Sequence, residues 1–285
     1  MNELDLIPFR TLLDHVVVPA RRHVRETLVP IGLPVAVMSV ATAVYQVRWS
    51  QSALVTAPDD LGSFFAGCVV LMLLLVLTWF VLGMAFNALT VAAMDAVSGR
   101  EVRMARAWGF VFRPPVFATL VLVGLLDTLS VCAFVLPALY VVPLLSLTLP
   151  AMVDEGLVGF DALRRSAELV RFNPTGRLVH SPWLQVFLLL LVGAVLNYAA
   201  NLVVQMPFVV VQQLLFLRET FSGPEAADAM RVALWLQLPA SLLGALASAV
   251  TWLYSAFGIC LLFRELRRRK EAPDLEEAVE RLVAS

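Results

Sequence analysis

The sequence predicts an all-α polytopic membrane protein with six transmembrane helices, and three observations support this class. Hydrophobic residues make up 60% of the 285 residues and charged residues only 15%, whereas a soluble domain is typically about half apolar and about a quarter charged. Six stretches approach the ~20 apolar residues that a helix needs to cross the hydrocarbon core. Basic residues gather at every second connection between them. Helices are expected because a backbone exposed to lipid must satisfy its own hydrogen bonds.

The six predicted spans follow one another closely along the chain. They cover residues 28–47, 64–90, 116–136, 138–152, 183–204 and a part of 234–263. Pro137 separates the third span from the fourth, which is the shortest. The apolar segment 206–219 is too short to span the membrane unaided. It therefore lies at the outer interface, dips back into the bundle or extends the fifth helix.

Basic residues determine the predicted orientation. With the N-terminus in the cytosol, 18 of the 21 Lys and Arg residues fall in the inside segments and three in the outside segments. Such an excess marks cytoplasmic segments, so both termini are predicted to lie in the cytosol. The chain then divides into an amphipathic N-terminal segment (1–27), a six-helix domain (28–263) and a basic C-terminal segment (264–285) with a short helix after Pro273. Arginine supplies 20 of the 21 basic residues, which hints at a GC-rich bacterial genome and hence a bacterial cytoplasmic membrane.

The segment that leaves the fourth span, residues 152–172, interrupts the apolar sequence with charge. Its apolar residues recur at spacings of three and four, which predicts an amphipathic helix lying flat on the cytosolic side of the bundle. They are Leu157, Phe160, Leu163, Ala167 and Val170. On the other face, Asp161–Arg165 and Glu168–Arg171 are predicted to form ion pairs within the helix. In the C-terminal segment, a spacing of four predicts the pairs Glu265–Arg269 and Arg267–Glu271.

We name such a charged segment between two spans an elbow. Asp154 and Glu155 are adjacent, so on a helix they diverge, and we interpret them as solvated residues of the membrane edge rather than an acid–base pair. A similar elbow precedes the third span, where Asp95 and Gly99 stand four apart as Glu155 and Gly159 do, and the N-terminal segment gives a third. Together they predict a basic collar facing anionic head groups, where each arginine contributes roughly 1 kcal/mol. The candidate lipid-contact residues are Arg100, Arg103, Arg106, Arg164, Arg165, Arg267, Arg268, Arg269 and Lys270.

Polar residues inside predicted spans are candidates for function, because burying them in lipid is costly. Asp127 lies about midway along the third span, and no Lys or Arg lies deep in any span. A neutral Asp127 hydrogen-bonded to Asn197, Asn201, Asn87 or a threonine would form a structural clasp between helices. The alternatives are a proton or substrate site, and a position nearer the outer interface.

Residues that could carry out catalysis or bind a metal are sparse. The three cysteines are far apart within apolar runs, and the three histidines lie outside the spans. The sequence contains no zinc motif, nucleophile elbow or phosphate-binding loop. We therefore expect no enzymatic activity, no cofactor, no metal and no nucleic-acid partner.

Two segments resemble a known family. DEGLVGFDALRRSAELV (154–170) resembles the glutamate–glycine–alanine–arginine–serine signature of the six-helix membrane domain of glycerophosphoryl diester phosphodiesterases, and LLFRELRRRKEAPDLEEAVERL (261–282) is similar to its closing segment. The matching residues of the closing segment are Leu266, Arg267, Arg269, Lys270, Glu271, Asp274 and Leu275. Glu265 stands where the family has Asp, and Arg264 where it has Tyr, with the aromatic Phe263 one place earlier. The resemblance implies the six-helix fold and its topology. It implies no activity, since the chemistry of the bifunctional members belongs to a separate soluble barrel.

These features predict a non-enzymatic scaffold or accessory subunit that contacts anionic lipid and a protein partner through its cytosolic basic elbows. The alternative is a transport or lipid-handling protein with a polar path around Asp127. A membrane-embedded hydrolase is a more distant alternative.

Overall fold

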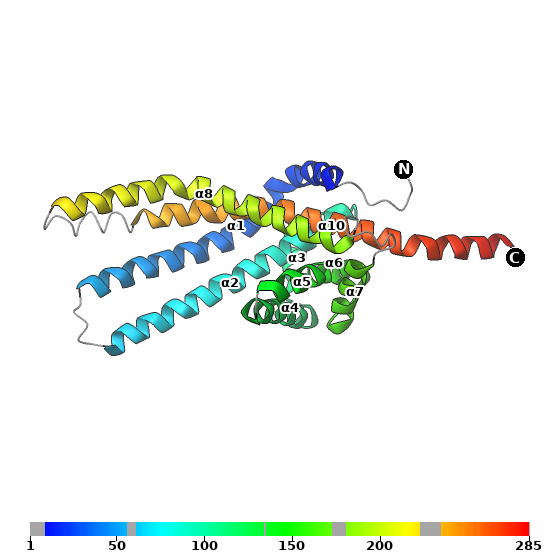
Figure 1. Cartoon of the computed structure of the whole chain (residues 1–285), viewed down its shortest axis with the longest axis horizontal. Helices are drawn as coiled ribbons and strands as arrows, with labels where there is room; N and C mark the ends of the chain where they lie inside the picture. Colours follow the sequence, from blue (N-terminus) through cyan, green and yellow to red (C-terminus); the bar gives the residue numbers. More distant parts are fainter. Residues whose placement is uncertain (1–8, 56–60, 134, 173–180, 223–234, 285) are drawn as a thin grey trace. The chain divides into compact units, whose positions relative to one another are not determined.

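The computed structural model describes residues 9–55, 61–133, 135–172, 181–222 and 235–284, which are almost entirely helical (Figure 1). In chain order the helices are α1 (Phe9–Val55), α2 (Leu61–Val97), α3 (Met104–Val111), α4 (Pro114–Ala133), α5 (Val135–Leu145), α6 (Thr148–Glu155), α7 (Phe160–Arg171), α8 (Pro182–Ser222) and α10 (Gln237–Ala284). No strand occurs in the described ranges, which confirms the predicted all-α class.

Six helical stretches are long and apolar enough to cross a membrane, as the sequence predicts. They are Asp14–Trp49, Phe64–Val97, Pro114–Ala133, Leu136–Glu155, Pro182–Leu215 and Gln237–Glu271. The fourth stretch combines two helices, because a turn at Ser146 and Leu147 separates α5 from α6. By length and composition, the chain is a multi-pass membrane protein.

Among the prolines that lie within helices, Pro207 and Pro273 bear on the predicted helix ends. Residues 206–219 belong to α8, which runs through Pro207, so the alternative that extends the fifth helix is confirmed. Likewise, α10 continues through Pro273, and the predicted break before a separate short helix is wrong. A proline inside a helix removes one backbone hydrogen bond, but the long helical stretches on both sides supply many others.

The helices contribute to two compact units. Unit 1 comprises Met1–Glu26, Asn87–Ala194 and Trp252–Ser285, and unit 2 comprises Thr27–Phe86 and Val195–Thr251. α1, α2, α8 and α10 each supply one part of their length to each unit. The division of α1 after Glu26 falls one residue before the end of the predicted N-terminal segment.

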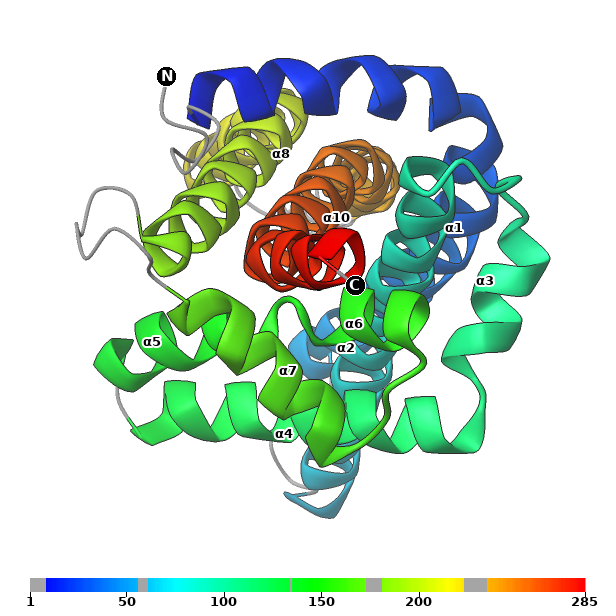
Figure 2. The same ribbon diagram turned by 90° about the vertical axis from the view of Figure 1, so that its right-hand side faces the viewer.

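Unit 1 is built around the last turns of α2 and the part of α10 that begins at Trp252. Figure 2 looks along this part of α10, while α4, α5 and the first part of α1 run across the view. Its fully buried large side chains include Leu89, Met94, Leu147, Met152, Leu169, Phe257, Leu262, Phe263 and Leu266. Ala88, Ala92 and Ala93 of α2 are buried as well, and such small residues let neighbouring helices approach closely.

Unit 2 consists of long apolar helices whose side chains are largely exposed. Phe65, Leu73 and Trp79 of α2 all face outward, and a large exposed apolar surface of this kind marks contact with a membrane or a partner. Within the unit, the hydroxyl groups of Thr42 in α1 and Thr78 in α2 share a hydrogen bond of 2.8 Å. The outward side chains are therefore suited to lipid as their solvent.

Candidate functional site

The elbow between α6 and α7 is the part of unit 1 where charged residues converge. α6 ends at Glu155, and Gly156 follows with a φ of 70°, a left-handed conformation that favours glycine. The backbone N–H of Gly159 donates to Thr119 Oγ1 of α4 at 2.8 Å, which ties the start of α7 to α4. Gly99 has the same φ of 70° after α2. Both predicted elbows therefore contain a glycine with a positive φ soon after the preceding helix ends.

The buried face of α7 differs from the predicted stripe. Leu163 and Val170 are buried as expected, but Phe160 is 76% exposed. Ser166 joins the buried face instead, because its hydroxyl donates to the backbone carbonyl of Leu144 in α5 at 2.5 Å. A buried hydroxyl with such a partner avoids the cost of an unmade hydrogen bond. The buried stripe of α7 is therefore rotated about the helix axis relative to the predicted stripe, and α7 remains amphipathic.

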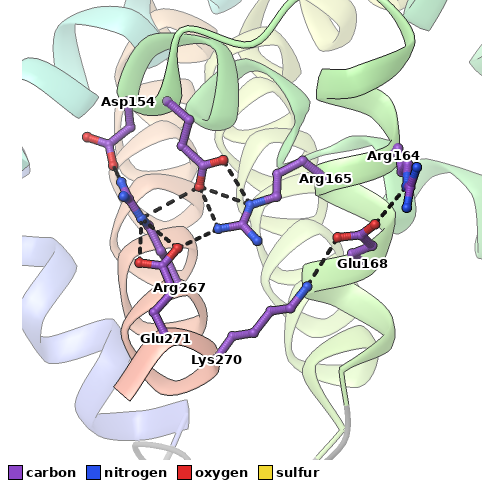
Figure 3. Close-up of polar contacts among 8 residues, drawn as sticks. Asp154, Arg164, Arg165, Glu168, Arg267, Lys270 and Glu271 are labelled. Carbon is purple, nitrogen blue, oxygen red and sulfur yellow. Dashed lines mark hydrogen bonds and ion pairs between the residues drawn. The ribbon is translucent and has the colours of Figure 1, made fainter. Parts of the chain in front are cut away.

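Arg165 of α7 joins α6 to α10 (Figure 3). Its guanidinium donates twice to Glu155 of α6, from Nε to Oε2 at 2.8 Å and from Nη2 to Oε1 at 2.9 Å. The same Nη2 donates to Glu271 Oε1 of α10 at 2.6 Å. The hydrogen bond to Glu155 is the largest cause that raises the pKa of Arg165, so its charge is permanent. Bidentate pairs of this kind are stronger than neutral hydrogen bonds.

Arg267 makes a second connection between α10 and α6. It donates to the carboxylate of Asp154, and its Nε donates to Glu271 Oε2 within α10 at 3.1 Å. Glu155 Oε1 lies 3.6 Å from the same Nε. Two arginines therefore share the carboxylates of Glu155 and Glu271.

Glu168 forms the outer part of this arrangement. It accepts from Arg164 Nε at 2.9 Å and from Lys270 Nζ at 3.2 Å. Both hydrogen bonds lower the pKa of Glu168, and the one from Arg164 has the larger effect. We call the following residues the elbow cluster: Asp154, Glu155, Arg164, Arg165, Glu168, Arg267, Lys270 and Glu271. The cluster contains four acidic and four basic side chains, each within an ion pair. It fixes α7 against α6 and α10, and none of its eight side chains is left as a free acid or base.

The ion pairs predicted within α10 are confirmed. Glu265 accepts from Arg269 at 2.6 Å, and the Arg267–Glu271 pair measures 3.1 Å. In each pair the two residues stand four positions apart on one helix. Side chains at this spacing are neighbours on the helix surface regardless of the tertiary structure.

The ion pairs predicted within α7 are wrong. Arg165 pairs with residues of α6 and α10 rather than with Asp161. Glu168 pairs with Arg164 and with α10 rather than with Arg171. A charge that is largely removed from water needs well-placed partners more than an exposed one does, so tertiary contacts override the local spacing.

The candidate lipid-contact residues differ in exposure. The side chains of Arg103, Arg164 and Arg268 are 68%, 81% and 75% exposed. Arg165 and Arg269 are largely buried against carboxylates. The other four, Arg100, Arg106, Arg267 and Lys270, are at most about half exposed and lie within ion pairs. Of the nine candidates, the first three therefore expose most of their side-chain surface.

Asp95 of α2 is a buried charge that sequence reasoning did not identify as a site residue. It is 0% exposed, and its carboxylate faces Arg100 Nε at 3.3 Å and Arg106 Nη1 at 3.5 Å. Arg100 Nη2 also lies 3.8 Å from Asp154 Oδ1, so it connects the two elbows. The signal that could have identified Asp95 was its spacing from Gly99, which matches that of Glu155 and Gly159.

Asn197 and Asn201 form a polar clasp between α8 and α10 in unit 2. Asn201 Nδ2 donates to Ser248 Oγ at 2.9 Å, and Thr251 Oγ1 donates to Asn197 Oδ1 at 2.8 Å. A Cβ at Gly244 would lie 3.0 Å from Asn201 Oδ1, so the two helices pack closely there. Hydrogen bonds of this kind between membrane helices contribute about 0.6 kcal/mol each.

Asp127 and Asn87 belong to unit 1. Asp127 is half-buried on α4, and its Oδ1 has no hydrogen-bond partner within the described part of the chain. Asn87 is half-buried on α2. The two asparagines of α8 take their partners from α10, and Asp127 is not part of that clasp. Among the described residues, His, Cys, Asp and Glu form no group of three or more that could hold a metal ion.

The fold and the elbow cluster define the class of this protein as a multi-pass helical membrane protein. Comparisons of the chain with protein-family models, curated proteins and solved structures give no match. The elbow cluster takes its residues from 154–170 and 261–282.

Proposed function

We propose that the chain is a non-enzymatic scaffold or accessory subunit of a bacterial cytoplasmic membrane, with its elbows and both termini in the cytosol. The observation that carries this proposal is the elbow cluster, whose charges neutralise one another across α6, α7 and α10. A general acid, base or nucleophile must be free to react. Carboxylates held by arginines favour a fixed platform instead.

The distribution of basic residues supports this orientation. Of the 21 Lys and Arg residues, 18 lie in segments that share one side if the chain crosses the membrane an even number of times between them. Cytoplasmic segments carry such an excess. The elbow cluster and the basic end of α10 would then face the anionic inner leaflet.

Exposed arginines in and beside the elbow cluster support contact with anionic lipid. Arg103, Arg164 and Arg268 come from different elements, and each is more than two-thirds exposed. Phe160 stands one turn before Arg164 on α7 and is exposed too. An apolar side chain next to a basic one suits a helix lying in the interface between head groups and acyl chains.

We also propose kinship with the membrane-domain family named above. What supports it is the direct contact of the two segments that carry the resemblance, through Arg165 of the first and Glu271 of the second. The six apolar helices agree with the six-helix fold of that family.

A second candidate function is transport or lipid handling around Asp127. One observation favours it, since Asp127 Oδ1 is buried without a hydrogen-bond partner in the described residues, and an unpaired carboxyl inside a membrane protein is a functional candidate. Against it, Asn197 and Asn201 are engaged with Ser248 and Thr251.

Lipid retention tests the leading proposal. The triple variant Arg103→Gln, Arg164→Gln, Arg268→Gln, purified in mild detergent, is expected to retain roughly tenfold less anionic phospholipid, relative to zwitterionic phospholipid, than the wild type. Three surface arginines contribute roughly 3 kcal/mol at most, and their existing ion pairs reduce this to the ~1.4 kcal/mol of a tenfold change. Mass spectrometry of the co-purified lipid measures the ratio.

Two control variants separate the alternatives. Arg48→Gln removes an exposed arginine that is predicted to lie outside, and it should leave the lipid ratio unchanged. Asp127→Asn should also have no effect if the protein is a scaffold. Loss of bound lipid with Asp127→Asn, but not with the triple variant, would favour the lipid-handling function and contradict the scaffold.

A further inference from the structure

The hairpin of α4 and α5 lies across the helices around which unit 1 is built. In Figure 1 the end of α2 and the final part of α10 run lengthwise, whereas α4 and α5 are seen nearly end-on. In Figure 2 the relation is reversed, and α4 and α5 run across the view. Both views therefore agree, and α4, α5, the end of α2 from Asn87 and the part of α10 from Trp252 all belong to unit 1. A helix that lies across α10 cannot cross the bilayer together with it.

The return leg of the hairpin is too short to cross the bilayer. α5 has 11 residues, which extend about 16 Å at 1.5 Å per residue, about half of the ~30 Å hydrocarbon core. The turn at Ser146 and Leu147 then redirects the chain into α6. Leu147, Ala151 and Met152 are buried by the protein rather than exposed to lipid. The apolar composition of the fourth predicted span thus reflects two helices in different surroundings.

Contacts along α5 place it at the level of an interface. The ring of Tyr140, in the middle of α5, lies 6.4 Å from the ring of Trp183. Trp183 is the second residue of α8, and tryptophan and tyrosine are enriched where membrane helices meet the head groups. The carbonyl of Leu144 accepts from Ser166 of the charged helix α7. α5 therefore contacts the start of α8 at its middle and the elbow helix α7 near its end.

The outward face of the hairpin is apolar. Leu125 and Leu129 of α4 and Leu136 and Leu139 of α5 are exposed. Exposing this face to water would be unfavourable, because burying one leucine side chain stabilises a protein by roughly 1.5–3 kcal/mol relative to leaving it exposed. Acyl chains next to the head groups of the same leaflet would cover it.

We infer that the α4–α5 hairpin lies within the leaflet next to the elbows, contacts the acyl chains of that leaflet with its outward face, and does not cross the membrane. This inference rests on one premise of the proposed function, namely that α10 crosses the bilayer. It leaves the charge distribution unchanged, because a hairpin returns to its own side whether or not it crosses. Four helices then cross the membrane instead of the predicted six.

The native Cys132 stands next to the tip of the hairpin and is exposed, which permits a direct test. With Cys68→Ala and Cys260→Ser in the full chain, Cys132 is the one remaining cysteine and can carry a nitrobenzoxadiazole fluorophore. Dithionite crosses bilayers slowly and quenches this fluorophore from the side to which it is added. The control labels, with Cys132→Ala, are Glu101→Cys in the elbow before α3 and Asp59→Cys between the first two predicted spans. Quenching is measured in right-side-out and inverted vesicles.

The label on Cys132 is expected to be quenched in the same vesicle orientation as the label on Glu101→Cys, and several-fold faster than in the opposite orientation. The inference is overturned if the label on Cys132 is quenched in the same vesicle orientation as the label on Asp59→Cys, or at equal rates in both orientations. The two controls report the orientation of the protein separately. If both controls are reversed while Cys132 still follows Glu101→Cys, the proposed cytosolic placement fails and the hairpin inference stands.

Discussion

Replacing Arg165 by glutamine is expected to lower the free energy of unfolding by about 2 kcal/mol. The substitution leaves Glu155 with one distant cation, Arg267 at 3.6 Å, and removes the connection to Glu271. Removing one partner of a fully buried pair costs roughly 3–5 kcal/mol, and the partial exposure of this pair places the cost below that range. Unfolding in micelles by heat or by a denaturing detergent, followed by circular dichroism, measures the change.

The neighbouring Arg164 provides a matched control. It carries the same charge on the same helix, but its side chain is 81% exposed and pairs with Glu168 at the surface. Exposed ion pairs contribute little, so Arg164→Gln should cost no more than about 0.5 kcal/mol. Equal effects of the two substitutions would show that Arg165 does not hold α6 and α10 together, and would contradict the elbow cluster as a structural platform.

Replacing Phe263 by alanine is expected to lower the free energy of unfolding by about 3 kcal/mol or more. Phe263 is 0% exposed on α10 and belongs to the core of unit 1. Truncating a buried phenylalanine to alanine typically costs roughly 3–5 kcal/mol, because it removes apolar contacts and leaves a cavity. The same unfolding measurement applies, and the thermal midpoint should fall along with the detergent midpoint.

Phe160→Ala serves as the control for this substitution. The sequence placed Phe160 on the buried stripe of α7, but it is largely exposed, so its truncation should change the unfolding free energy in micelles by less than about 0.5 kcal/mol. If Phe160→Ala destabilised the protein as much as Phe263→Ala, the observed rotation of α7 would be wrong and the predicted stripe would be correct.

The features that depend on composition could be predicted from the sequence. Six apolar stretches identified the six helical stretches that are long and apolar enough to cross a membrane, because a hydrocarbon solvent selects for length and hydrophobicity almost regardless of neighbours. The pairs Glu265–Arg269 and Arg267–Glu271 were predictable for a related reason, since a spacing of four on one helix brings side chains together without help from other elements.

The elbow cluster could not be predicted, because its partners are distant in sequence. Arg165 contacts Glu155 ten residues before it and Glu271 106 residues after it. No local rule selects these carboxylates over Asp161. The chain must first pack α7 against α6 and α10, and the buried face of α7 depends in turn on the hydrogen bond of Ser166 to α5.

The ends of helices were also difficult to predict. Pro207 and Pro273 looked like helix ends, yet both lie inside long helices. Conversely, the fourth predicted span looked continuous, yet it turns at Ser146 and Leu147. The turn is followed by α6, most of which is buried, so packing within unit 1 rather than local propensity decides the course of the chain there.

The account depends most on the elbows lying on the cytosolic side of the membrane. The direct measurement uses Arg164→Cys, an exposed position of α7, as the single cysteine after Cys68→Ala, Cys132→Ala and Cys260→Ser. A membrane-impermeant maleimide is added to spheroplasts before and after permeabilisation. The account predicts labelling only after permeabilisation. Labelling of Arg164→Cys in intact spheroplasts would place the elbow cluster outside and contradict it.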